Sequence, residues 1–249
     1  MTFVRRFIVV IALGMLAGCA VRSISNSGYS DSGNSNPYRC GDQSSNPFYK
    51  GELSELDVLG IDVGANTSEK AIQQALNTAA PISLHKGDSL LVIQSGALIP
   101  DEPMVRALER YFTVAQFSGI PQDKADGKGR NGYSAALRLA AARAGLKKIF
   151  VYWGTLETAQ QNLATKTVSW VPVVGGLLPD ETQDMRIRLK VAIVDVATGS
   201  WATYSPDGFG DKAISARLNR ESSDQAQVAA LKERSYIAAV DDLIKRYVK

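Results

Sequence analysis

Few residues in this sequence have types that could carry out catalysis, and they are widely spaced. His85 is the only histidine, so a His-based zinc site lacks further imidazoles and a Ser-His-Asp triad would have to recruit this residue. Because His85 stands beside Lys86-Gly87, we expect it in a surface turn. Ser95-Gly96 follows an apolar run, and together with acidic residues of unassigned role it is the evidence for the alternative of a hydrolase with an unidentified acid-based site. We predict that the protein is not an enzyme.

Acidic residues gather near glycines and prolines in two stretches, Asp180-Glu181-Asp184 and Asp207–Asp211. Neither stretch has the spacing of a calcium-binding loop, so we expect both to be solvated loops. A carboxylate metal centre or an acid pair for general acid-base catalysis stays the alternative. We predict no metal and no cofactor.

The stretch Gly127–Gly132 spells G-x-G-x-x-G before a helical pattern. In a dinucleotide-binding fold the first of these glycines follows a buried strand directly. Here the preceding residues are polar and include Pro121, so we expect a glycine-rich loop. The alternative is an anion held by Lys128 and Arg130.

Two further groups of residues are candidates for interaction with a partner. Arg186, Arg188 and Lys190 alternate with apolar residues, which predicts a strand with one wet face that is either solvated or binds an anionic partner. Residues 168–178 form a largely apolar loop that either folds back on the core or projects as an interaction surface or shallow membrane contact. The candidates in this loop are Trp170, Val173, Leu177 and Leu178.

The elements that position these residues alternate between helix and strand. Hydrophobic spacing and capping signals predict helices near 66–79, 101–112, 133–144 and 223–247. Short apolar or alternating runs predict strands near 90–93, 113–117, 148–153, 167–172, 186–191 and 200–204. The order predicts one α/β domain with a mixed sheet, in which three helix-strand units precede antiparallel strands and helices, including a C-terminal one, cover the sheet.

The N-terminus has the layout of a signal peptide. Arg5 and Arg6 precede a short apolar run, Phe7 to Leu16, which is too short to span a membrane. The run closes on Leu16-Ala17-Gly18-Cys19, which resembles the lipobox of bacterial lipoproteins. The resemblance implies that residues 1–18 are removed and that Cys19 becomes the lipidated N-terminus, carrying palmitate. Ala20-Val21 follows without an aspartate, which in that family favours the outer membrane.

Residues 19–51 are predicted to be the lipidated cysteine and a flexible tether rich in Ser, Asn and Gly, and residues 52–249 the globular domain. The alternative for Pro47-Phe48-Tyr49 is docking on the domain or on a partner. With Cys19 lipidated, Cys40 has no intramolecular partner, so no disulfide is predicted. Basic and acidic residues number 28 and 25 and are interspersed, which excludes a typical nucleic-acid binder.

The segment from Arg188 to Trp201 resembles the strand-turn-strand of the curli-secretion lipoprotein superfamily, whose fold is similar to the N-terminal domain of the Tol system's periplasmic protein. Ala141 to Trp153 is similar to a helix-strand step of that superfamily. The resemblance implies assembly into a ring or secretion channel. Its long insertions for a transmembrane barrel are not evident here.

Together these patterns predict a non-enzymatic envelope lipoprotein, held by Cys19 at the periplasmic face of the outer membrane. We expect it to bind another envelope protein or itself, as a binding or assembly component. A periplasmic hydrolase and a subunit of an oligomeric secretion channel stay as alternatives.

Overall fold

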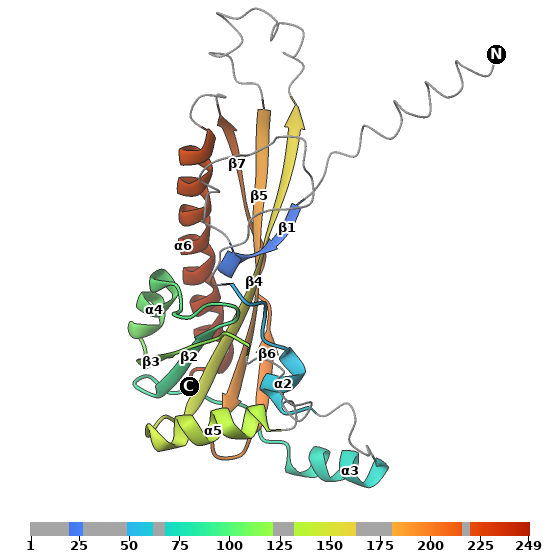
Figure 1. Ribbon diagram of the computed structural model, residues 1–249. Helices are drawn as coiled ribbons and strands as arrows, with labels where there is room; N and C mark the ends of the chain where they lie inside the picture. Colours follow the sequence, from blue (N-terminus) through green and yellow to red (C-terminus); the bar gives the residue numbers. More distant parts are fainter. Residues whose placement is uncertain (1–19, 27–48, 62–67, 122–131, 163–180, 216–219) are drawn as a thin grey trace, which may run out of the picture.

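The computed structural model describes residues 20–26, 49–61, 68–121, 132–162, 181–215 and 220–249 (Figure 1). The strands are β1 (Ala20–Ser23), β2 (Ser89–Gln94), β3 (Thr113–Phe117), β4 (Lys148–Asn162), β5 (Glu181–Asp195), β6 (Trp201–Tyr204) and β7 (Phe209–Ser215). The helices are η2 (Ile24–Asn26), α2 (Glu55–Leu59), α3 (Glu69–Thr78), α4 (Glu102–Glu109), α5 (Tyr133–Arg143) and α6 (Arg220–Tyr247).

Within the described residues, seven strands form one mixed sheet, as predicted. Its central order is β3-β2-β4-β5-β6, with β1 paired to β4 and β7 paired to β5. The strand β2 runs parallel to its neighbours β3 and β4, because α4 connects β2 to β3 and α5 connects β3 to β4. The strand β5 runs antiparallel to its neighbours β4 and β6. The 15-residue strands β4 and β5 pair along their whole length and form the long ribbon in Figure 1.

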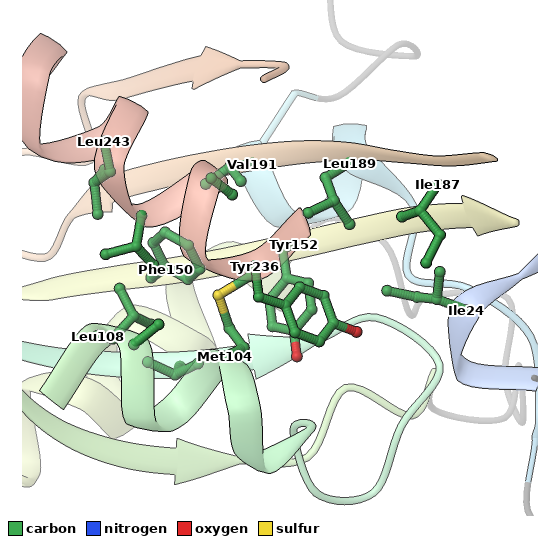
Figure 2. Packing of buried hydrophobic residues seen from close by; sticks show 14 of the residues in the cluster. Ile24, Met104, Leu108, Phe150, Tyr152, Ile187, Leu189, Val191, Tyr236 and Leu243 are labelled. Atoms are coloured by element: carbon green, nitrogen blue, oxygen red, sulfur yellow. The ribbon is translucent and has the colours of Figure 1, made fainter. Parts of the chain in front are cut away.

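Helices cover the sheet on both faces because alternate strand residues point to opposite sides. On one face α4 and α6 pack against a cluster that contains Phe150 and Tyr152 (Figure 2). On the other face α5 and α2 contribute to a second cluster that contains Ile149 and Val151. The run Leu90–Ile93 of β2 is buried from both sides, as its continuous apolar sequence predicts.

The C-terminal helix α6 begins at Arg220, three residues earlier than predicted. It packs on the face of the sheet that contains Phe150 and Tyr152. Tyr236 is fully buried, and its ring meets that of Tyr152 edge-on with the centroids 5.7 Å apart. Its hydroxyl donates to Asp101 at 2.5 Å, just before α4. The contact joins α6, β4 and α4 through one side chain.

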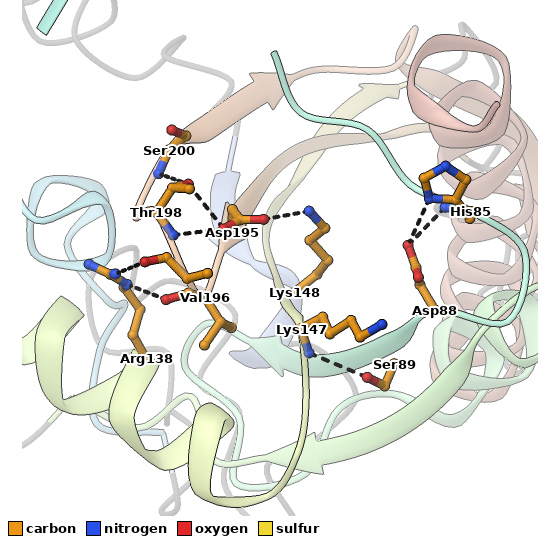
Figure 3. Close-up of polar contacts among 11 residues, drawn as sticks. His85, Asp88, Ser89, Arg138, Lys147, Lys148, Asp195, Val196, Thr198 and Ser200 are labelled. Carbon is orange, nitrogen blue, oxygen red and sulfur yellow. Dashed lines mark hydrogen bonds and ion pairs between the residues drawn. The ribbon is translucent and has the colours of Figure 1, made fainter. Parts of the chain in front are cut away.

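The predicted turn after β5 is confirmed. The Asp195 carboxylate accepts a hydrogen bond from the Thr198 backbone N–H at 2.8 Å, and Gly199 takes a φ of +75° that favours glycine (Figure 3). The other carboxylate oxygen lies 2.5 Å from Lys148 Nζ on β4. Burial raises the pKa of the Asp195 carboxyl, but the hydrogen bonds from Lys148 and Thr198 outweigh it and lower the pKa below its ordinary value.

The prediction of a flexible tether over 19–51 is wrong for its first residues. Ala20–Ser23 form β1, which pairs with β4 along the edge that β2 leaves open. Ile24 is 1% exposed and points toward Ile187 in the core (Figure 2). Ser25 Oγ donates to the Ser95 carbonyl at 2.5 Å. One buried isoleucine and these backbone partners stabilise a segment whose polar composition indicates a coil.

The prediction and the structure differ in the extent or burial of some elements. The strand predicted for 148–153 continues to residue 162, and the strand β7 was not predicted. The helix α3 begins at Glu69, three residues later than predicted, with Ser68 Oγ accepting from the Ala71 backbone N–H at 3.2 Å. Its apolar residues Ile72 and Leu76 are 43% and 65% exposed, so its apolar face has no cover within the described residues.

Candidate binding pocket

A pocket of about 780 Å³ lies where the β4–β5 ribbon passes beyond α2. Up to Trp153, this face of the sheet is covered by α5 and α2, and beyond it no described helix packs on the face. Residues from β1, the 49–55 segment, β4, β5 and the 205–208 loop line the pocket: Arg22, Ser23, Tyr49, Glu52, Glu55, Trp153, Gly154, Thr155, Arg186, Arg188, Leu189, Lys190, Ser205, Pro206, Asp207 and Gly208.

The three predicted cations of β5 line this pocket together. Arg186 and Arg188 are exposed and Lys190 is half-buried, while the intervening Ile187 and Leu189 are buried. The wet strand face predicted from the sequence is therefore confirmed. The binding of an anionic partner to it stays a prediction.

Carboxylates opposite these cations hold them in place. Glu157 of β4 lies directly across from Arg186, and one of its oxygens accepts a hydrogen bond from Arg186 Nε at 2.8 Å. Its other oxygen forms an ion pair with Arg188 Nε at 3.1 Å. Lys190 pairs with Glu55 at the start of α2. Because one carboxylate serves two guanidiniums, the Arg186–Arg188–Glu157 group carries a net positive charge.

Aromatic side chains form another wall of the pocket. Trp153 Nε1 donates to the Leu53 carbonyl at 2.9 Å, which fixes the 49–55 segment against β4. The Tyr49 hydroxyl donates to Glu52 at 3.2 Å. Burial and the neighbouring Glu52 carboxylate raise the pKa of Tyr49 to about 12, so its hydroxyl stays a donor at neutral pH. The alternative that Tyr49 docks on the domain is confirmed, whereas Pro47 and Phe48 lie outside the described residues.

Sequence reasoning missed residues that line the pocket or pair with its cations. Glu157, Glu55 and Trp153 were not singled out. The alternation of Trp153, Thr155 and Glu157 along β4 has the same period of two as the cations of β5 and was the available signal. The register that places Glu157 opposite Arg186 is a property of the paired strands and has no signature in either segment alone.

Comparison with known proteins assigns the chain to a family. Residues 54–246 match the family of YafT bacterial lipoproteins. The chain belongs to this family. The matched residues include the described elements from α2 to α6, whereas β1 and the lipobox lie before the matched residues. No curated protein matches the chain. The resemblance to the curli-secretion superfamily stays a prediction.

Solved structures of three bacterial proteins show a distant likeness to this YafT-family chain. A neuraminyllactose-binding hemagglutinin homolog from Helicobacter pylori is 15% identical, with 67% of this chain and 86% of that chain covered and a TM-score of 0.29. Lipoprotein GNA1162 from Neisseria meningitidis is 13% identical, with 64% and 99% covered and a TM-score of 0.24. The hypothetical protein CT253 from Chlamydia trachomatis is 13% identical, with 62% and 94% covered and a TM-score of 0.27. TM-scores this low do not establish a shared fold.

The residues considered for a hydrolase are not brought together. Ser95 is 1% exposed, and its hydroxyl accepts from the Leu53 backbone N–H at 2.7 Å. His85 lies before the other end of β2, with its side chain 66% exposed and 3.7 Å from Asp88 (Figure 3). Six strand residues separate the two ends by about 20 Å. A nucleophile and its base must lie within about 3 Å, so these two cannot form such a pair in this structure.

Several predicted site residues lie outside the described residues: Cys19, Cys40, Gly127–Asn131, Trp170, Val173, Leu177, Leu178 and Asp180. Among the residues of the two acidic stretches predicted from the sequence, Asp207 lines the pocket. Across the part of the chain that the structure describes, no three His, Cys, Asp or Glu side chains gather in a way that could hold a metal ion. None of the described helices is long and apolar enough to cross a membrane.

Proposed function

We propose that this YafT-family lipoprotein is anchored through acylated Cys19 at the periplasmic face of the outer membrane and acts there as a non-enzymatic binding component. The observation that carries the binding role is the charged pocket beyond α2, which has cations paired with carboxylates and two aromatic side chains. Specific polar recognition needs such fixed donors and acceptors in a concave site.

The placement of β1 supports anchoring close to the membrane. Ala20, the residue after Cys19, already pairs with Thr158 of β4. A lipid on Cys19 would therefore attach directly to the folded domain, without the spacer that a tether would supply. The pocket, which Ser23 lines, would then face the space next to the membrane surface.

Labelling with radioactive palmitate tests the anchor. We expect label in the wild-type protein, no label in Cys19→Ala and full label in Cys40→Ala, which is a matched control because these are the only two cysteines. Separation of inner and outer membranes on a density gradient tests the location. Label that survives in Cys19→Ala contradicts the proposal, and recovery of the wild type with the inner membrane contradicts the placement.

Chemical crosslinking in intact cells tests the binding role. We expect a crosslinked species with another envelope protein or with a second copy, and its loss in Glu157→Arg, which reverses the charge that holds Arg186 and Arg188. The exposed pair of Arg106 with Glu102 on α4 offers a control, Glu102→Arg, outside the pocket. A protein that stays monomeric and uncrosslinked contradicts a protein-binding role.

A further inference from the structure

The pocket lies close to the residue that would carry the lipid. Val21, Glu157 and Arg186 form one row across β1, β4 and β5. Adjacent strands are about 4.8 Å apart and a strand rises about 3.3 Å per residue. Arg186 therefore stands about two strand spacings sideways and one residue along from Ala20, the residue that follows Cys19 in the sequence, which amounts to about 10 Å. A headgroup next to the anchor is within reach of this side chain.

The two arginines retain hydrogen-bond donors that Glu157 does not use. Each guanidinium has five N–H donors, and one carboxylate accepts only some of the ten. The side chains of Arg186 and Arg188 are 49% and 57% exposed, more than that of Glu157 at 27%. The donors that Glu157 leaves unused are therefore accessible from the pocket mouth, in the planar arrangement that matches phosphate oxygens.

The neighbouring backbone holds both arginines at the pocket mouth. Gly208 lies over their stems, since a Cβ there would be 3.5 Å from Arg186 Cδ and 3.6 Å from Arg188 Cγ. Glu157 fixes the inner side of the guanidiniums. Because the side chains are ordered before a ligand binds, little conformational entropy is lost on binding.

We propose that this pocket binds the phosphate group of an anionic phospholipid in the leaflet that holds the Cys19 anchor, through Arg186 and Arg188. The inference deepens the proposed function and rests on its anchor at Cys19. The bound phospholipid would give the domain a second contact with the membrane, in addition to the acyl chain on Cys19. Two contacts would fix the orientation of the domain relative to the membrane surface.

Native mass spectrometry of the full-length mature protein, extracted from membranes in mild detergent, tests this inference. The protein is titrated with phosphatidylglycerol, with diacylglycerol of the same chain length, and with glycerol phosphate. We expect phosphatidylglycerol to bind and the other two not to bind. In Arg186→Gln/Arg188→Gln the affinity should fall about 25-fold, because each cation near an anionic group contributes a factor of about five.

Two further variants make the result decisive. Arg106→Gln/Arg110→Gln removes two exposed charges of the α4 region outside the pocket and should leave the affinity unchanged. Arg188→Gln leaves the pair of Arg186 with Glu157 in place and should lose about fivefold, so the test does not depend on the double variant folding.

The assignment would be overturned by equal binding of diacylglycerol, by an equal loss in the α4 control, or by an unchanged affinity in Arg188→Gln. Binding of glycerol phosphate as tight as that of phosphatidylglycerol would also overturn it, because the ligand would then be a soluble phosphate. The protein mass in the same spectra reports acylation of Cys19 separately. An unmodified chain refutes the anchor, whereas an acylated chain without bound phosphatidylglycerol refutes the pocket assignment alone.

Discussion

Truncation of Ile24 to alanine tests whether the segment after Cys19 is part of the folded domain. Ile24 is 1% exposed and lies in the cluster between β4, β5 and α6. The substitution removes three carbons at about 0.8 kcal/mol each, or about 2.4 kcal/mol in transfer free energy. The cavity left behind raises the loss in the free energy of unfolding to about 3–4 kcal/mol. For a domain of this size we expect the melting temperature to fall by about 10 °C.

Urea denaturation followed by tryptophan fluorescence measures this loss, with Ile72→Ala as the matched control. Ile72 lies on α3 and is 43% exposed, so its truncation should change the free energy of unfolding by no more than about 0.5 kcal/mol. If Ile24→Ala unfolds at the same urea concentration as Ile72→Ala, residues 20–26 do not pack on the domain, and the direct attachment of the anchor to the sheet is refuted.

Three further substitutions test other parts of the structure. Gly154→Ala should lower the free energy of unfolding by about 1–3 kcal/mol, because the new Cβ would lie 2.5 Å from Ile24 Cδ1. In a protein that already carries Ile24→Ala, Gly154→Ala should lower the free energy of unfolding by less. If the effects of the two substitutions simply add, the contact between these residues is contradicted. The lowered pKa of Asp195 gives stability that is complete above about pH 4 and is lost as the pH falls through the folded-state pKa. Denaturation at pH 6 and pH 2.5 should thus show a smaller acid loss in Asp195→Asn than in the wild type, and equal losses would show that the pair with Lys148 is without effect. Ser95→Ala should cost about 1–3 kcal/mol in urea denaturation, since it leaves a buried backbone N–H without its acceptor, and a neutral result would contradict that hydrogen bond.

The helices and strands of the folded domain were largely predictable from local patterns. The apolar run at 90–93, the alternation at 186–191 and the turn at 195–199 each appear in the structure as expected. Such patterns depend on side-chain period and turn chemistry, which neighbouring residues determine. The mixed sheet followed from the order of these elements.

The pocket could be predicted only in part. The wet face with Arg186, Arg188 and Lys190 followed from alternation within one strand. Their partners Glu157 and Glu55 come from β4 and from the start of α2, at distances along the chain that no local pattern encodes. The site has two guanidinium groups paired with one carboxylate, and this arrangement depends on the register between β4 and β5.

The sequence by itself determined the lipobox resemblance, the α/β class and the wet face of β5, because each of these depends on residues close together along the chain. Only the tertiary structure decided that residues 20–26 belong to the domain, because Ile24 gains its burial from β4 and β5, more than a hundred residues away. A polar segment with one isoleucine has no local signal for order, since the free energy that orders it comes from surfaces that exist only after the ribbon has formed.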